Sequence, residues 1–175
     1  MNEYRQNLLK DIGINKPENK ISKEHWFEIS QNKTLSEDFI REFKEKLNWW
    51  RICVYQELSE DFIREFQNEV YWTEVSAHQK LFENFIREFQ EKVNWRIISE
   101  YQNLSTDFLI EFKDEINWDF YLYNENLIFS MVKKFASRFS ISKSLLDNSN
   151  LNEEQLKEIK KLLNLKNMFT NKKTL

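Results

Sequence analysis

The feature that most constrains this chain is a tandem repeat of 23 residues. Four consecutive blocks align without gaps at 35–57, 58–80, 81–103 and 104–126, and a tryptophan recurs in each, at Trp49, Trp72, Trp95 and Trp118. The phrase that begins at Phe39 (FIREF) returns verbatim at Phe62 and Phe85. A fixed period in this range is typical of stacked repeat arrays, in which each unit buries its apolar face against the next. We therefore predict an array of stacked repeats.

Each repeat begins with the pattern of a short helix. In the first repeat, Ser36 is placed to cap the helix, acidic residues fill the first turn, and Leu35 stands at hydrophobic-staple spacing from Ile40. The apolar residues that follow define one helical face as far as about Lys46. In the third repeat Phe82 replaces the capping serine, so we expect its first helix to fray more.

A second helix follows within the same repeat. Asn48 interrupts the first helix and is expected to cap the second, with its buried face at Trp49, Ile52 and Tyr55. Asn94 and Asn117 hold the same position in two other repeats, whereas the second repeat has Tyr71 there, which leaves its cap in doubt. The predicted fold class is all-α, a short α-solenoid of two-helix repeats with helical caps at the N- and C-termini.

The remaining segments are expected to complete the array. Trp26 lies one period before Trp49, which predicts a half repeat before the first full one, and Phe139 would close a degenerate unit after the fourth. A capping-box pattern at Asn152 begins a last helix. The predicted organisation is an N-terminal cap segment at 1–20, a repeat array at 21–141 (half repeat 21–34, four full repeats, degenerate repeat 127–141), a polar turn region at 142–150, a capping helix at 151–165 and a tail at 166–175.

Composition limits the classes of function. One glycine and one proline among 175 residues argue against sandwiches, barrels and glycine-rich phosphate loops. The net charge of -3 shows no basic excess of the kind that nucleic-acid binders carry. No signal-peptide pattern and no apolar run of membrane-spanning length are visible, so we expect a cytoplasmic protein, in a bacterial host, with no membrane partner.

No set of residues with catalytic or metal-binding spacing stands out. His25 and His78 lie in no zinc-binding pattern, and Cys53 shares a column of the alignment with small serines, which indicates a packing position. The glutamates recur with the repeat and so share one environment, whereas a catalytic pair needs two different ones. They are interpreted as a solvated ridge that pairs with Arg41, Arg64 and Arg87. We predict no enzyme activity, no catalytic residues, no cofactor and no metal.

The positions that vary between repeats point to recognition. Repeats keep the columns that form the core, and the varying columns lie on the second helix, where large apolar or basic residues replace charged or small ones. Aromatic and arginine side chains of this kind are common interface hot spots. The alternative is that Phe120 and Tyr123 only pack against the irregular end of the array. The predicted partner-binding residues are Trp50, Arg51, Arg96, Ile97, Phe120 and Tyr123.

The repeat phrases resemble those of a known group of proteins. L-S-E-D-F-I-R-E-F followed by N-W-x-x-I-S-x-Y-Q, over Trp26 to Asn126, is similar to the short tandem repeats found in uncharacterised proteins of phages, prophages and large DNA viruses. The resemblance implies origin and architecture and no particular activity. The composition, rich in Lys, Asn, Ile and Phe, also fits an AT-rich bacterial or phage genome.

These observations lead to three functional hypotheses. The first is a non-enzymatic protein-binding module, phage-encoded, that inhibits a host complex such as a CRISPR-type defence nuclease. The second is a protein that binds nucleic acid through Lys133, Lys134 and Arg138, or mimics it with the acidic ridge. The third is a structural protein whose array ends stack head to tail, which the caps at both ends argue against.

Overall fold

The computed structural model of the chain describes residues 3–32, 34–138 and 149–170, with 163–170 described by their backbone alone. Every regular element in these ranges is helical, and consecutive helices pack as repeats, which confirms the predicted all-α solenoid class. The chain divides into two compact units, Met1–Phe85 (unit 1) and Ile86–Leu175 (unit 2). The division falls inside the short helix α7 (Glu83–Glu88), the first helix of the third repeat.

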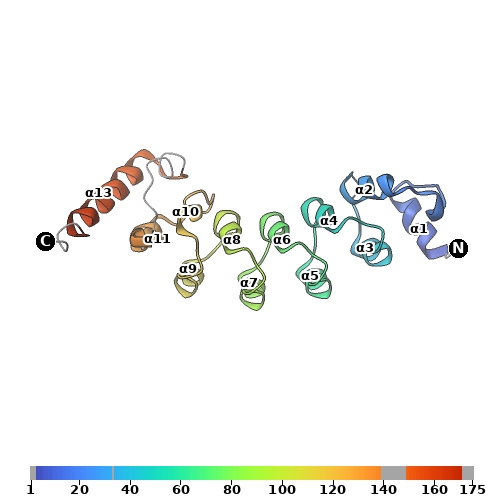
Figure 1. The fold of residues 1–175 in the computed structure, drawn as a ribbon, viewed down its shortest axis with the longest axis horizontal. Coiled ribbons are helices and arrows are strands. Elements are labelled where there is room, and N and C mark those ends of the chain that lie inside the picture. The colour runs from blue at the N-terminus through green and yellow to red at the C-terminus, as the bar shows by residue number, and fades with distance from the viewer. Residues whose placement is uncertain (1–2, 33, 139–148, 171–175) are drawn as a thin grey trace. The chain divides into compact units, whose positions relative to one another are not determined.

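In unit 1 the helices form two rows. Second helices make one row, in which α4 packs against both α2 and α6, and first helices make the other (Figure 1). The predicted half repeat at 21–34 supplies α2. The elements of unit 1 before α7 are α1 (Glu3–Asp11), the 3-10 turn η1 (Glu18–Lys20), α2 (Lys23–Asn32), α3 (Glu37–Phe43), α4 (Trp49–Tyr55), α5 (Glu60–Glu65) and α6 (Trp72–His78).

The first helices begin at the predicted caps but end earlier than predicted. Ser36 Oγ accepts a 3.1 Å hydrogen bond from the backbone N–H of Phe39, and the corresponding serines cap α5 in unit 1 and α9 in unit 2. Helix α3 stops at Phe43, short of Lys46, and gives way to a turn. After this turn, the N–H of Asn48 donates to Ser30 Oγ in the preceding half repeat at 2.9 Å.

The second helices show the effect of the predicted asparagine caps. Asn48 Oδ1 accepts from the N–H of Arg51 at 2.9 Å. Tyr71, the N-cap residue of α6, makes no side-chain cap bond, although its backbone angles, φ -88 and ψ 100, match those of the capped position Asn94. The missing cap is therefore confirmed, and the helix forms without it because packing supplies most of the stability of a short helix.

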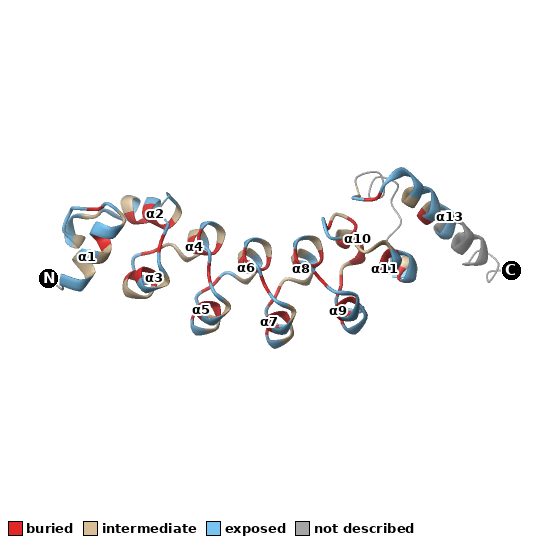
Figure 2. Ribbon diagram, turned by 180° about the vertical axis from the view of Figure 1, so that it is seen from behind, coloured by how far each residue is buried: buried red, intermediate tan, exposed pale blue. Residues whose placement is uncertain are grey.

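Aromatic rings hold successive repeats of unit 1 together. Trp26 from the half repeat lies 5.1 Å from the ring of Phe43 in the first repeat, and Trp49 lies 5.1 Å from Phe66 in the second. In Figure 2 the buried residues lie on the sides of the helices that face neighbouring repeats. Each such aromatic side chain removes roughly 150–250 Å² from water, or about 4–6 kcal/mol at ~25 cal/mol per Å² before the entropy cost of folding.

A buried polar column runs alongside this apolar core. Gln79 accepts a 2.9 Å bond from the N–H of Leu58, and its amide donates to the carbonyl oxygens of Cys53 and Gln56, both at 2.8 Å. Gln56 makes the corresponding bonds one repeat earlier, to Leu35 and Ser30. The glutamines therefore satisfy backbone groups that the short helices leave without partners, as buried polar groups require.

The predicted N-terminal cap segment contacts the first repeat through Arg5 of α1, which lies 2.9 Å from Glu42. Helix α1 ends at Asp11, and Gly13, two residues later, has a φ of 80, the left-handed conformation that favours glycine. The N–H groups of Gly13 and Ile14 donate to the carbonyls of Lys10 and Leu9, the two bonds of a Schellman motif. Leu9 and Ile14, which flank this motif, are both buried and provide its apolar contact.

Unit 2 repeats the same plan and then departs from it. Helices α8 and α10 pack against each other, as the second helices of unit 1 do (Figure 1). Helix α10 is only four residues long, and the buried Tyr121 at its end accepts a 2.9 Å bond from the N–H of Ile128. The elements after α7 are α8 (Trp95–Tyr101), α9 (Thr106–Glu111), α10 (Trp118–Tyr121), α11 (Phe129–Lys134), η2 (Ala136–Arg138) and α13 (Glu153–Thr170).

In the fourth repeat, in unit 2, a buried asparagine takes the place of the glutamine. The next position in the column is Glu125, but the buried side chain is Asn124, one residue earlier. Its amide donates to the carbonyl oxygens of Ser99 and Gln102 at 2.9 and 2.8 Å. Asparagine is one methylene shorter than glutamine, and the shift of one residue compensates for the shorter reach.

The C-terminal part of the chain differs in one respect from the prediction. Asn152 and Gln155 exchange the two bonds of the predicted capping box, both at 3.0 Å. Helix α13 then continues to Thr170, so 166–170 is helix and not part of a tail. No glycine or proline occurs after Asn152 to end the helix. Phe139, 142–148 and 171–175 lie outside the described residues.

Candidate binding surfaces

The second-helix side of unit 1 carries two of the predicted partner-binding residues. Trp50 is 39% exposed, and its ring meets that of Tyr55 edge-on at 6.4 Å. Arg51 lies on the same helix, with its guanidinium carbon 3.5 Å from the ring centroid of Phe27 on α2. Cation–π contacts of this kind are attractive by roughly 0.5–2 kcal/mol and favour this placement of the arginine on the ring. We call Phe27, Trp50, Arg51 and Tyr55 the α2–α4 patch.

Tyr55 was assigned to the buried face of the second helix, and that assignment was wrong. Its side chain is 48% exposed, and the buried residues of α4 are Ile52 and Cys53. Positions three and four apart share a helix face, whereas six residues turn by about 240° and point elsewhere. The same correction applies to the column as a whole, because Tyr101 and His78 are exposed too.

The remaining predicted partner-binding residues lie in unit 2. The guanidinium carbon of Arg96 on α8 lies 3.9 Å from the ring centroid of Phe120, and Phe120 lies 6.3 Å from Tyr123. Ile97 is half-buried next to Arg96. The structure thus brings the predicted residues together as two sets, Trp50 with Arg51 in unit 1, and Arg96, Phe120 and Tyr123 in unit 2.

A contact also supports the alternative interpretation, that Phe120 and Tyr123 pack against the irregular end of the array. The side-chain amide of Asn150 donates to the carbonyl oxygen of Tyr123, and its backbone N–H donates to that of Leu122 at 2.8 Å. The segment before α13 therefore lies against the backbone at the end of the fourth repeat. The residues of the α2–α4 patch have no such contact with a chain end among the described parts of unit 1, which makes this patch the stronger candidate.

The basic residues proposed for nucleic acid lie close to carboxylates. Lys133 Nζ is 3.0 Å from a carboxylate oxygen of Glu158, and Arg138 is 2.6 Å from Asp114. The hydrogen bond from Arg138 lowers the pKa of the Asp114 carboxyl. Lys134 lies over the ring of Phe135 at 5.6 Å. Two of the three cations are therefore already paired with acidic side chains.

The acidic ridge is tied to arginines, partly in a way that sequence reasoning missed. Arg41 pairs with Glu37 in its own helix at 3.5 Å, as predicted, but its shorter contact is 2.8 Å to Glu65 in the next repeat. Its guanidinium carbon also lies 5.0 Å from the ring centroid of Phe62. Arg87 makes the same two kinds of contact in unit 2, to Glu111 and Phe108. The arginine column thus connects neighbouring repeats.

The other titratable residues have structural environments. Burial raises the pKa of the Cys53 thiol to about 11, and its Sγ lies 3.4 Å from the backbone nitrogen of Tyr71. His78 Nε2 lies 3.6 Å from Glu74 on the surface of α6. Within 3–32, 34–138 and 149–170, no group of three or more histidine, cysteine or acidic side chains is arranged to hold a metal ion. The helices in these ranges are also too short or too polar to span a bilayer.

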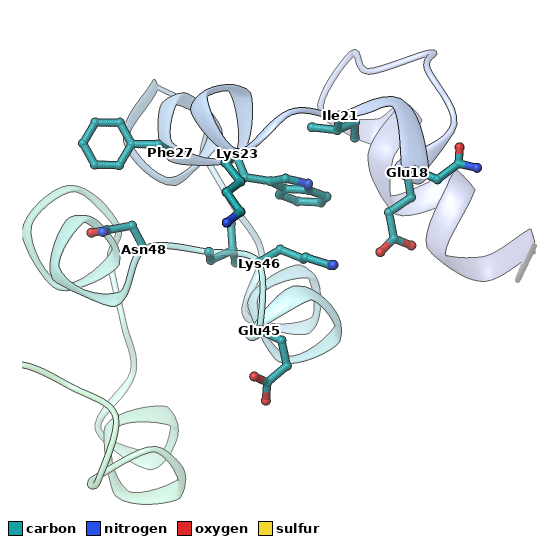
Figure 3. A pocket seen from close by; sticks show the side chains of 10 residues that line it. Glu18, Ile21, Lys23, Phe27, Glu45, Lys46 and Asn48 are labelled. Carbon is teal, nitrogen blue, oxygen red and sulfur yellow. The ribbon is translucent and has the colours of Figure 1, made fainter.

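Unit 1 also contains an open pocket that sequence analysis did not predict. It lies between η1, α2 and the turn after α3, with a volume of about 860 Å³ (Figure 3). Phe27 belongs both to this pocket and to the α2–α4 patch. Subtracting the period from Trp50 gives Phe27, so the repeat contained a signal for this residue. The pocket itself depends on η1, which lies outside the repeats.

Comparison with models of protein families, with curated proteins and with solved structures gives no match to this chain. The fold defines the class of protein, a short helical-repeat solenoid. The resemblance to repeat proteins of phages, prophages and large DNA viruses stays a prediction.

Proposed function

We propose that this chain is a non-enzymatic protein-binding module, and that the α2–α4 patch is its main contact surface. The observation that carries the proposal is the exposed pair of rings, Trp50 and Tyr55, beside an arginine that is stacked on Phe27. Tryptophan, tyrosine and arginine are the residue types that dominate binding energy in interfaces.

The scaffold supports this assignment. The core is filled by apolar residues that recur at the same positions of successive repeats and are buried. The exposed aromatic residues are therefore not needed to fill it. Covering such side chains by a partner gains roughly 25 cal/mol for each Å² of apolar surface. Rigid helices also reduce the ordering cost that binding has to overcome. A second candidate surface, in unit 2, consists of Arg96, Ile97, Phe120 and Tyr123.

The experiment is an affinity capture from lysate of a bacterial host, with and without nuclease treatment. The triple variant Trp50→Ala/Arg96→Ala/Phe120→Ala tests both surfaces, and Trp50→Ala/Arg51→Ala tests the α2–α4 patch alone. The control is Phe82→Ala/Ile110→Ala, since Phe82, just before α7, is 65% exposed and Ile110 is exposed on the first helix α9. Circular dichroism checks that each variant stays helical.

We expect a protein partner that survives nuclease treatment, is retained by the control and is lost in both patch variants. A partner retained by both patch variants would contradict the chosen surface. Capture that disappears with nuclease would favour the nucleic-acid hypothesis, and its affinity should then fall steeply with salt. Light scattering that shows concentration-dependent filaments would favour the self-assembly hypothesis.

For the identity of the partner we propose a host complex such as a CRISPR-type defence nuclease. Only the resemblance of the repeat phrases to phage and prophage proteins supports this narrower statement. It is tested by adding the purified chain to such a nuclease and measuring cleavage of its target, with Trp50→Ala/Arg51→Ala as the control. Cleavage that is unaffected across the nucleases tried would remove this class of partner.

A further inference from the structure

The pocket in unit 1 contains a buried tryptophan whose indole N–H has no partner. Trp26 lines the pocket and is only 4% exposed, and none of the described residues accepts a hydrogen bond from its Nε1. Trp49 of the first repeat also lacks such a bond among the described residues, but its side chain is half-buried and therefore closer to solvent. Because a buried donor without a partner is unfavourable, Trp26 has the greater need of an acceptor.

In three later repeats the equivalent indole N–H is bonded to the backbone. Trp72 in unit 1 donates to the carbonyl oxygen of Gln67, five residues earlier, at 3.0 Å. The same bond occurs twice in unit 2, at 3.0 Å in both cases, in Trp95 with Gln90 and Trp118 with Lys113. Each acceptor belongs to the turn that follows a first helix. The repeats therefore show which group this indole N–H binds, an uncharged backbone carbonyl.

The half repeat does not supply this carbonyl, because α2 begins earlier than its counterparts. Helix α2 starts at Lys23, three residues before Trp26, whereas α4 and α6 start at the tryptophan itself. The backbone N–H of Trp26 donates to the carbonyl of Ser22 at 3.0 Å, as part of this additional turn of helix. The residue five positions before Trp26 is Ile21, which lines the same pocket (Figure 3). The pocket thus lies beside a donor that lacks its usual acceptor.

The lining of the pocket favours a ligand without net charge. Its charged members are two of each sign, Lys23, Lys46, Glu18 and Glu45. Its apolar members are Ile21, Trp26, Phe27 and Leu47. A volume of about 860 Å³ is in the range that holds a small ligand or a few peptide side chains. An uncharged ligand with an aliphatic side chain next to a carbonyl oxygen is complementary both to this lining and to the indole donor.

We propose that the pocket binds an uncharged segment of a partner polypeptide. One backbone carbonyl of that segment accepts the hydrogen bond of Trp26 Nε1, where later repeats use a carbonyl of their own turn, and an adjacent aliphatic side chain lies against Phe27 and Leu47. That the ligand is a polypeptide rests on the proposed protein-binding function. Phe27 also belongs to the α2–α4 patch, so one partner can reach both.

The test follows the indole N–H signals of the full-length, isotope-labelled chain by NMR, in which each of the six tryptophans gives one signal. The probe is N-acetyl-leucine N-methylamide, which combines backbone carbonyls with an aliphatic side chain and carries no charge. We expect it to bind with a dissociation constant of about 1–10 mM, to shift the Trp26 signal and to slow its hydrogen exchange about threefold or more.

Three related compounds test which features of the probe matter. N-acetyl-glycine N-methylamide lacks the aliphatic side chain and 3-methylbutan-1-ol lacks the carbonyl, so both should bind at least about fivefold more weakly. N-acetyl-leucine carries a carboxylate in place of the methylamide and should bind no more tightly than the probe. Tighter binding of this anion would contradict an uncharged ligand.

Two phenylalanine substitutions locate the site. Trp26→Phe keeps an aromatic ring in the core and removes the donor, so the shifts that the probe causes at the backbone amides of Phe27 and Asn48 should weaken at least about fivefold. Trp49→Phe also removes an indole N–H that has no partner among the described residues, but Trp49 is not part of the pocket lining, so binding should stay unchanged. Circular dichroism checks that both variants stay helical. If Trp26→Phe does not fold, the comparison of compounds on the wild type decides.

The proposal is overturned if the probe leaves the Trp26 signal unmoved, if the compounds without the side chain or the carbonyl bind as well as the probe, or if a folded Trp26→Phe binds like the wild type. If one of these results is found while Trp50→Ala/Arg51→Ala still abolishes partner capture, the pocket proposal fails and the protein-binding function stands.

Discussion

The amide of Gln79 donates a 2.8 Å hydrogen bond to the carbonyl oxygen of Gln56, the residue at the same position one repeat earlier. Both side chains are buried, and each also accepts a bond from a backbone N–H at the start of a first helix. The bonds that each glutamine donates join it to backbone carbonyls of the preceding repeat, whereas the bond that it accepts lies within its own repeat.

Gln79→Met should therefore destabilise the fold although it nearly preserves the volume of the side chain. The substitution leaves the N–H of Leu58 and the carbonyl of Cys53 buried without these partners, at roughly 1–3 kcal/mol for each group. The free energy of unfolding, measured by urea denaturation, should fall by about 2–6 kcal/mol. Gln90→Met, at an exposed position, is the control and should change it little. An equal loss in both variants would show that the buried bonds contribute nothing specific.

Tyr71→Asn should stabilise the protein. The backbone at Tyr71 already has the angles of the capped position Asn94, so an asparagine there can accept the bond that α6 lacks. A side-chain cap is worth about 1 kcal/mol. Thermal unfolding should show a higher midpoint for Tyr71→Asn and a lower one for Asn94→Ala. A lower midpoint for Tyr71→Asn would mean that the tyrosine ring stabilises the surface more than a cap does.

The tryptophan column should respond unevenly to truncation. Trp118 is 3% exposed and stacks on Phe135 at 4.3 Å, whereas Trp95 is only half-buried. Trp118→Ala should cost about 3–5 kcal/mol, the usual range for a large buried aromatic, and Trp95→Ala should cost less. Urea denaturation of both variants tests the order. The reverse order would mean that exposure does not govern the cost of truncation in this array.

Cys53 should make the stability depend on pH in alkaline solution. Burial raises the pKa of its thiol to about 11, whereas the unfolded chain ionises near pH 8.5–9. The folded state therefore binds more protons in this interval, so the contribution is complete below about pH 8.5 and is lost as pH rises towards 11. Its size is at most roughly 2–3 kcal/mol.

Cys53→Ser isolates this contribution, because serine is the residue in the corresponding buried positions, Ser30, Ser76 and Ser99. The difference in unfolding free energy between the wild type and Cys53→Ser should shift in favour of the variant as pH rises from about 8 to 10.5. Subtracting the variant removes the contribution of Tyr121, whose pKa burial also raises. A difference that stays constant with pH would contradict the raised thiol pKa.

The repeat allowed most of the fold to be predicted. A fixed period shows which residues are equivalent, so the serine and asparagine caps, the missing cap at Tyr71 and the small-residue column at Cys53 all followed from one alignment. It does not show which side of a short helix faces a neighbour. Tyr55 was therefore placed in the core although it is exposed, since two turns of helix contain too few residues to define a buried face.

The candidate surfaces were less predictable. Trp50 and Arg51 stood out because their columns vary, but the partner of Arg51 is Phe27, in a half repeat whose packing the period alone does not specify. The contacts of Arg41 with the next repeat also depend on the distance between neighbouring repeats, which the period does not give. The pocket is built partly by η1, where no repeat exists, so only the folded chain could reveal it.

The glutamine column has a consequence for how such a chain can change over evolutionary time. The side-chain amide of each glutamine donates to backbone carbonyls of the preceding repeat. These backbone atoms are the same whatever side chains that repeat carries. An in-frame duplication or deletion of one 23-residue repeat therefore leaves every buried amide with a suitable partner. A gene that encodes this repeat can lengthen or shorten its product by recombination between repeats. Mutation can alter the exposed side chains of each repeat independently.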